Sequence, residues 1–206
     1  PTGAGKSSIL NLISRFYDVQ HGSVLVDDVD VRDYARRELR SRIAIVLQDV
    51  FLFRGSVLDN VRLFDESISR ERVEEAMRTV HADGILARLP DGLDARVEER
   101  GANFSAGERQ LLAFARALVH DPAILVLDDA TSSIDTATEK LIQQALEALR
   151  KDRTTIVVAH RLSTIKTADN ILVMRRGEIA EQGTHEALLA EGGLYRKLYD
   201  LQVRHD

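Results

Sequence analysis

Cysteine does not occur in the 206-residue sequence, which excludes disulfides and thiolate-bound metal centres. Long apolar runs are also missing, because no stretch approaches the roughly 18 residues that a membrane-spanning helix needs. If a membrane is involved, another segment must cross it. The first residues also lack the charged and apolar regions of a signal peptide.

An excess of basic charge is absent as well. The sequence has 28 Lys and Arg against 33 Asp and Glu, a formal net charge of -5. No overall positive field therefore attracts nucleic acid or an anionic membrane, and we expect no nucleic-acid partner. Hydrophobic residues make up 44% of the chain and charged residues 30%, which fits one globular domain with a core of its own.

Strand and helix patterns alternate along the chain, without an internal repeat or a low-complexity segment. Short apolar or β-branched runs predict strands at 23–26, 43–47, 124–127, 155–159 and 171–174. Amphipathic spacing predicts helices at 8–16, 57–89, 186–190 and 194–201, and one more that begins at Ser105. We therefore expect an α/β fold, a mainly parallel sheet flanked by helices, with an inserted helical subdomain at about 50–120.

The apolar spacing also predicts which helix faces are buried. These faces are Ile9, Leu12, Ile13 and Phe16; Val73, Met77 and Val80; and Leu111, Phe114, Ala115 and Leu118. Thr136 and Glu139 have the spacing of a capping box at the start of a further helix.

The opening residues, Pro1 to Ser8, match all but the first position of the phosphate-binding pattern G-x-x-x-x-G-K-[ST]. Its glycines let backbone N–H groups approach phosphate oxygens, which the following helix N-terminus also attracts. We expect Lys6 to reach the β- and γ-phosphates and the Ser7 hydroxyl to coordinate Mg²⁺. The alternative is a glycine turn ahead of a helix, with a solvated lysine. Because the pattern's first glycine and its strand belong upstream of Pro1, we expect the chain to be cut at its N-terminus.

A phosphate loop of this kind needs a second anchor for the metal at the end of a buried strand. Asp128 follows the continuous apolar run Ile124–Leu127, which is typical of a parallel strand covered on both faces. We expect its carboxylate to hold the Mg²⁺ shell. The alternative is that Asp128 or Asp129 caps a helix.

Between these anchors the sequence Phe104–Gln110 reads F-S-A-G-E-R-Q, which resembles the LSGGQ signature of the ATP-binding-cassette (ABC) family. The order of Lys6, Gln48, this signature, Asp128 with Asp129, Asp135 and His160 is also similar to that family. The resemblance covers essentially the whole chain. It implies a nucleotide-binding domain over 1–206, with a P-loop NTPase, RecA-like core whose N-terminal strands are missing.

The family resemblance implies ATP and Mg²⁺ as ligands and assigns the site residues. The ATP-binding residues are Thr2, Gly3, Ala4, Gly5, Lys6, Ser7, Ser8, Gln48, Ser105, Gly107, Asp135 and His160. The metal ligands are Ser7, Gln48 and Asp128, and the catalytic residues are Asp129, His160 and Gln48.

The finer resemblance is to ABC exporters, and it lies in 48–64, 97–101, 160–164 and 183–185. It implies a transmembrane domain on the same full-length polypeptide, contacted around Gln48 and 97–101, and a place on the cytoplasmic face of the cell membrane. ATPases of chromosome maintenance belong to the same broad type, but the long heptad insertion they need is missing. A P-loop kinase or GTPase would not explain the signature.

Ser105 and Gly107 open a predicted helix, so a hydroxyl, backbone N–H groups and a helix dipole converge on a second anion site. In the family this site receives the γ-phosphate held by a partner's P-loop. Two domains then pair head to tail, as a homodimer or a heterodimer, around two ATP molecules. The alternative reading is a helix cap with Glu108 as its capping-box partner, and both readings can hold together.

Asp129 departs from the family, which has glutamate at this position. Its shorter side chain predicts a carboxylate roughly an ångström from the productive position, a misplacement that can cost about a hundredfold in rate. One reading is a working ATPase that compensates for this change. The other is the slow, ATP-clamping half of a heterodimeric exporter. The signature also departs at Phe104, at Ala106, where a positive φ would cause strain, and at Glu108, which brings a negative charge near a phosphate site.

Overall fold

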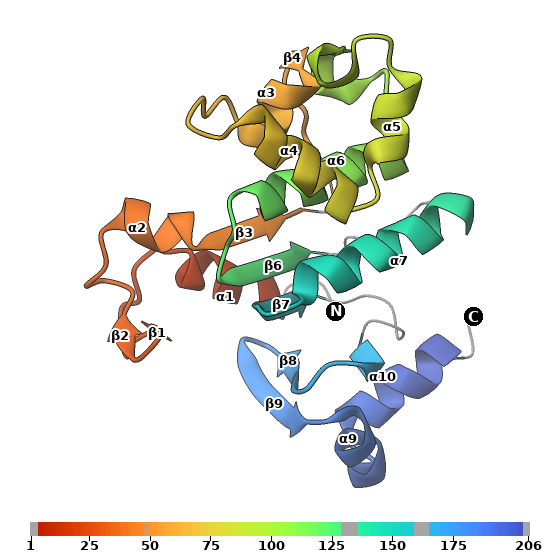
Figure 1. Cartoon of the computed structure of the whole chain (residues 1–206). Helices are drawn as coiled ribbons and strands as arrows, with labels where there is room; N and C mark the ends of the chain where they lie inside the picture. The colour runs from red at the N-terminus through yellow and green to blue at the C-terminus, as the bar shows by residue number, and fades with distance from the viewer. Residues whose placement is uncertain (1–3, 48, 129–135, 159–164, 204–206) are drawn as a thin grey trace. The chain divides into compact units, whose positions relative to one another are not determined.

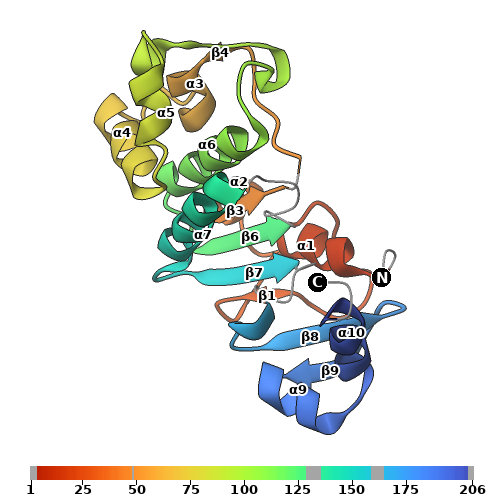
Figure 2. The same ribbon diagram turned by 90° about the vertical axis from the view of Figure 1, so that its right-hand side faces the viewer.

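The computed structural model describes residues 4–47, 49–128, 136–158 and 165–203. The chain divides into two compact units, one formed by residues 37–157 and the other by residues 1–36 with 158–206. Figures 1 and 2 show the elements of each unit from two sides.

A three-stranded sheet organises the unit of residues 37–157. Its strands are β3 (Ile43–Val46), β6 (Ile124–Asp128) and β7 (Thr154–Val158), in the order β3-β6-β7. Strands β3 and β6 are parallel, with Ile43 opposite Ile124 and Val46 opposite Leu127, and the arrows of β6 and β7 point the same way in Figure 2. Leu125 and Val126 are 0% exposed, which confirms the prediction of a central strand covered on both faces.

Helices fill the chain between β3 and β6. They are α3 (Val57–Arg62), α4 (Arg70–Thr79), α5 (Asp83–Arg88) and α6 (Ala106–Val119). This stretch also contains two 3₁₀ turns, η1 (Gly92–Asp94) and η2 (Glu99–Gly101), and the antiparallel pair β4 (Gly55–Ser56) and β5 (Arg96–Val97). Two further helices lie outside it: α2 (Arg36–Ser41) precedes β3, and α7 (Thr136–Arg150) precedes β7. The predicted helical stretch 57–89 is thus three helices, because Leu63 and His81 have positive φ values of 53° and 56° and end α3 and α4.

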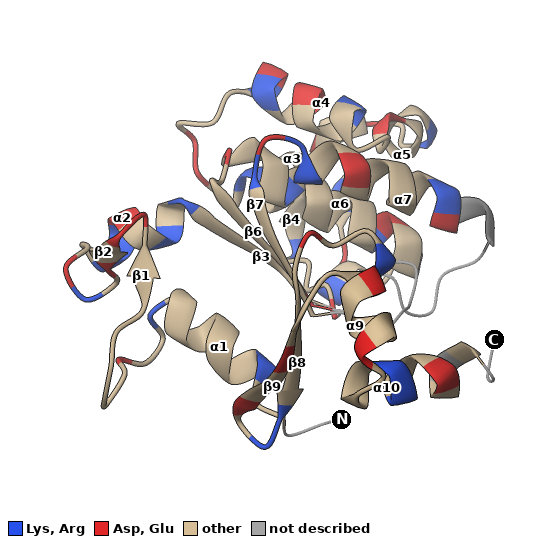
Figure 3. Cartoon of the chain, turned by 90° about the horizontal axis from the view of Figure 1, so that it is seen from below, with Lys and Arg blue, Asp and Glu red and all other residues tan. Residues whose placement is uncertain are grey.

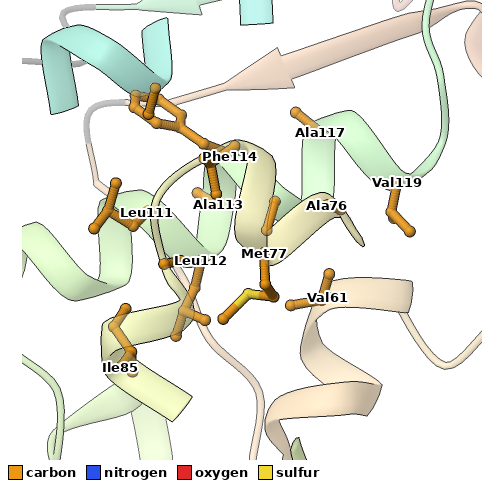
Figure 4. Packing of buried hydrophobic residues seen from close by; sticks show 14 of the residues in the cluster. Val61, Ala76, Met77, Ile85, Leu111, Leu112, Ala113, Phe114, Ala117 and Val119 are labelled. Carbon is orange, nitrogen blue, oxygen red and sulfur yellow. The ribbon is translucent and has the colours of Figure 1, made fainter. Parts of the chain in front are cut away.

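The core of this unit lies around α6. The predicted face of Val73, Met77 and Val80 is confirmed, since all three are 0% exposed. In Figure 4, Met77 points toward Leu112 of α6 and Val61 of α3.

Helix α6 is buried on more sides than its sequence predicts. Leu111, Phe114 and Ala115 are buried as expected, but Leu118 is only half-buried, whereas Leu112 is 1% exposed. The reason is that α6 contacts α3, α4, α7 and β3. A helix enclosed by neighbours on several sides does not need a single apolar stripe.

The described residues of the other unit form two hairpins and several helices. Its elements are α1 (Lys6–Ile13), β1 (Leu25–Val26), β2 (Val29–Asp30), β8 (Ile171–Arg175), β9 (Glu178–Gly183), α9 (His185–Glu191) and α10 (Leu194–Val203). Strands β1 and β2 pair antiparallel, and so do β8 and β9. Val173, Leu188 and Tyr195 form a small core that joins β8, α9 and α10. These elements confirm the predicted strands and helices of this unit with somewhat different bounds, except β2, which was not predicted.

The predicted buried face of the first helix is partly wrong. Phe16 is 55% exposed, because α1 ends at Ile13 and Arg15 turns the chain away with a φ of 50°. Leu10, which the stripe omitted, is 7% exposed and is the buried residue of the helix. The predicted cap by Thr136 concerns a side chain outside the described residues.

Candidate functional site

The opening loop turns into α1 at Gly5. Gly5 has a φ of 100°, and its carbonyl oxygen accepts a hydrogen bond from the Ile9 N–H at 3.2 Å. The Ala4 carbonyl oxygen accepts from the Gly177 N–H at 3.1 Å, and a Cβ on Gly5 would lie 3.3 Å from the Gly177 Cα. Both the backbone angle and this close approach therefore favour glycine at position 5.

The N-terminal end of α1 has the features of an anion site. Within the described residues it has no side-chain cap and no acidic residue in its first turn. Figure 3 shows α1 without acidic side chains. Ser7 and Ser8 are exposed and Lys6 is half-buried. The backbone N–H groups of the first turn and the helix dipole therefore favour a bound anion.

The sheet brings Asp128 and the strand ends that precede two other predicted site residues to one edge. Strand β6 ends at Asp128, which is half-buried, and its parallel neighbour β3 ends at Val46, two residues before Gln48. Strand β7 ends at Val158, two residues before His160. Since β3, β6 and β7 are adjacent, their carboxyl ends lie along the same edge of the sheet. Six predicted site residues themselves fall outside the described residues: Thr2, Gly3, Gln48, Asp129, Asp135 and His160.

Helix α6 begins with the capping box that its sequence predicts. The Ser105 hydroxyl oxygen accepts from the Glu108 N–H at 3.2 Å, and the Glu108 Oε2 accepts from the Ser105 N–H at 2.8 Å. Ala106 is the first helical residue and does not have a positive φ, so it brings no strain of that kind. Gly107 is buried in the first turn.

The carboxylate of Glu108 is fully engaged within this part of the fold. Besides its bond to Ser105, it forms an ion pair through Oε1 with the guanidinium of Arg88, the last residue of α5. The Glu108 side chain is only 17% exposed. The Glu108 carboxylate therefore lies against the helix and is paired with Arg88.

The segment 97–101 is fastened to the start of α6. Gly101 has a φ of 69°, and a Cβ there would lie 2.7 Å from Leu52 Cδ1, so both the backbone angle and the close approach favour glycine. The Asn103 side chain makes two hydrogen bonds to the backbone at the start of this segment. Its Oδ1 accepts from the Glu98 N–H at 3.0 Å, and its Nδ2 donates to the Arg96 carbonyl oxygen at 2.9 Å. The Gly101 carbonyl oxygen also accepts from the Phe104 N–H at 3.0 Å, so the segment is bonded to the first residue of the signature.

A cavity of about 500 Å³ lies beside β3, and sequence reasoning missed it. Exposed Phe51 and Phe53, whose ring centroids are 5.0 Å apart, line it together with Arg116. Arg116 donates to the carbonyl oxygens of Asn60 at 2.9 Å and Phe51 at 3.0 Å. Burial lowers the pKa of Arg116, and no acidic side chain pairs with it in the described part of the chain. The F-x-F spacing was the available signal for this apolar face.

Comparisons with known proteins agree with this arrangement. A family model described as ABC transporter matches residues 1–132. A probable multidrug resistance ABC transporter ATP-binding/permease protein of Bacillus subtilis is 54% identical over 201 residues, which are 98% of this chain and 30% of that protein. An ATP-dependent lipid A-core flippase of Shewanella oneidensis is 47% identical over 203 residues, 98% of this chain and 34% of the flippase.

The solved structures give the same result for the fold. A bacterial Atm1-family ABC exporter with ATP bound has a TM-score of 0.90 and 43% identity, over 98% of this chain and 35% of that one. The chain thus spans about a third of the length of the curated relatives it matches. Among the described residues, every helix is too short or too polar to cross a bilayer.

Proposed function

We propose, since the chain belongs to the ABC transporter family, that it is the nucleotide-binding domain of an exporter and that it binds and hydrolyses ATP to drive transport. The observation that carries this proposal is the presence of two helix N-termini suited to phosphate in one chain, after Gly5 and after Ser105. Relatives named as an ATP-binding/permease protein and a lipid A-core flippase support the same reading.

In the proposed site, the loop Thr2–Ser8 wraps the phosphates of ATP and Lys6 neutralises part of their charge. Mg²⁺ would be held by Ser7, Gln48 and Asp128, and this donor set fits because Mg²⁺ prefers hard oxygen ligands together with substrate phosphates. When bound, the ion neutralises charge on the β- and γ-phosphates. Gln48, Asp129 and His160 would orient the attacking water and contact the γ-phosphate.

The second half of each site comes from another nucleotide-binding domain. In a head-to-tail pair, Ser105 and Gly107 of one domain meet the γ-phosphate held by the other, while Asp135 lines the same interface. ATP is then part of the interface, and its hydrolysis loosens the pair. The relative named as an ATP-binding/permease protein supports a place for such a pair in a complete transporter.

The proposed membrane partner is a transmembrane domain on the same full-length polypeptide, which places this chain on the cytoplasmic face of the membrane. Support comes from the length of the relatives, of which this chain covers about a third. The apolar cavity beside Phe51 and Phe53 and the segment 97–101 are the surfaces that we assign to this contact.

A second candidate follows from Asp129, which occupies the position of the family's catalytic glutamate. In this reading the chain is the slow half of a heterodimeric exporter. Its own ATP acts as a clamp, while its signature serves the partner's nucleotide. Inserting one methylene at this position would lengthen the reach of the carboxylate.

Single-turnover hydrolysis of ATP at this site, in the full-length assembly, distinguishes the two candidates. We expect Asp129→Glu to raise the rate by up to about a hundredfold if the clamp reading holds, because the carboxylate then reaches the water. Lys6→Ala serves as the control that abolishes turnover at this site. Wild-type turnover as fast as that of a partner site with glutamate would rule out the clamp.

A further inference from the structure

The signature helix α6 carries an electrostatic conflict at its N-terminus. Its positive end favours an anion, yet Glu108 places a formal negative charge on the third residue of the helix. Glutamate at this position stabilises the helix through the capping box. The same charge would repel a phosphate that approaches Ser105 from a partner domain, because like charges in a half-buried site are weakly screened.

Arg88 resolves this conflict in the structure. Its guanidinium pairs with Oε1 of Glu108, while Oε2 is held by the Ser105 N–H at 2.8 Å. Both carboxylate oxygens are thereby used. Arg109, which follows Glu108 in the sequence, does not pair with this carboxylate in the described structure. It donates instead to the Phe104 carbonyl oxygen at 2.6 Å. Of these two cations, Arg88 of α5 is the one that pairs with the Glu108 carboxylate within the described residues.

The exposure of the pair argues against a purely structural role. The Arg88 side chain is 66% exposed, and exposed ion pairs contribute little to the stability of a fold. Glu108, by contrast, is only 17% exposed, so its charge is felt at the helix end when Arg88 is removed. Replacing Arg88 should therefore leave a largely buried, unpaired negative charge at the helix end.

We propose that Arg88 is a positioning residue of the phosphate half-site on α6. It holds Glu108 against the helix and neutralises its charge, so that the N-terminus of α6 accepts the γ-phosphate of an ATP held by the partner domain. This inference rests on the proposed function, and it adds to it a residue of α5 that lies outside the phosphate loop, strand ends and signature.

The test measures ATP-driven closure of the full-length transporter in lipid nanodiscs. One cysteine introduced into this chain, which has none of its own, carries the label once any cysteines in the rest of the transporter have been replaced. Energy transfer to the other nucleotide-binding domain then reports closure. We expect Arg88→Ala to raise the ATP concentration for half-maximal closure by about threefold to tenfold. Arg88→Lys, which keeps the charge, should restore most of the wild-type value.

The double variant tests the mechanism directly. Glu108→Gln keeps the capping box but removes the charge, so it should leave the ATP requirement unchanged or lower. In that background, Arg88→Ala should have no further effect. The Arg88→Ala shift should also shrink in high salt, because the Debye length falls from about 10 Å at 0.1 M to about 3 Å at 1 M.

Arg70→Ala is the matched control, since it removes an exposed ion pair with Asp94 that includes no residue of α6. It should leave the ATP requirement unchanged. The inference is overturned if the wild type closes with ATP but Arg88→Ala closes at the same concentration, or if the same shift persists with Glu108→Gln. Failure of the wild type to close with ATP would instead overturn the proposed function.

Discussion

At the scale of single residues, His120 shows how a helix end can create a pH-sensitive group. His120 follows the last residue of α6, and its Nε2 is buried without a hydrogen-bond partner in the described structure. Burial is the main cause that lowers its pKa below the ordinary value of 6.5. Arg72 and Arg116 lower the pKa further, whereas the carboxylate of Asp65 acts in the opposite direction.

The lowered pKa of His120 predicts a loss of stability in acid. Between the two pKa values of His120, the unfolded chain binds more protons than the folded chain. The contribution of His120 to the free energy of unfolding is therefore complete above pH 6.5, and it is lost as the pH falls toward the folded pKa. His120→Gln should flatten this fall in urea denaturation between pH 7 and pH 5. The same substitution at an exposed histidine, His21→Gln, serves as the control for the change of residue type. Equal pH dependence of His120→Gln and wild type would contradict the prediction.

At the scale of elements, α10 is capped by a side chain from a distant strand. Glu181 of β9 accepts hydrogen bonds from the N–H groups of Leu194 and Tyr195, the latter at 2.8 Å. No residue adjacent to the helix supplies this cap in the described structure. The carboxylate also complements the positive end of the α10 dipole, so the hairpin and the helix stabilise each other.

Replacing Glu181 with alanine should therefore destabilise α10 by about 1–2 kcal/mol, because two N–H groups lose their acceptor. Hydrogen exchange should become faster at Leu194 and Tyr195. The comparison is Thr184→Ala, which removes the local cap of α9, where the Thr184 hydroxyl accepts from the Ala187 N–H at 3.3 Å. If Thr184→Ala, but not Glu181→Ala, makes exchange in α10 faster, Glu181 does not cap this helix.

At the scale of the whole molecule, the proposed head-to-tail pair makes a prediction that does not depend on any single distance. Each complete site combines the Lys6 loop of one domain with the Ser105 helix of another. Lys6→Ala and Ser105→Arg should each abolish ATP-driven closure in a homodimer, because both sites lose one half.

Mixed dimers of these two variants should recover about half of the closure signal, since one site then contains two intact halves. The measurement is energy transfer in full-length assemblies purified with two different tags. Homodimers of each variant, mixed after assembly, provide the baseline. Mixed dimers as inactive as their parents would contradict a head-to-tail arrangement, because they would place both halves of a site on one domain.

The sequence alone determined the order of the elements and the positions of the motifs. Gly5 before α1, Asp128 at the end of β6 and the Ser105 capping box all depend on residues close in sequence, so local patterns predict them well. The sequence also predicts the buried strand β6, because a parallel strand covered on both faces requires an uninterrupted apolar run.

How distant residues complete these local features depends on tertiary contacts. The burial of α6 on several sides, the Arg116 hydrogen bonds to Asn60 and Phe51, and the Arg88–Glu108 pair join positions whose spacing carries no periodic signal. For Glu108, local sequence predicts only the charge and the capping position. Whether that charge repels or tolerates a phosphate depends on a guanidinium that folding brings to it from α5, since electrostatic effects depend on distance in space and not along the chain.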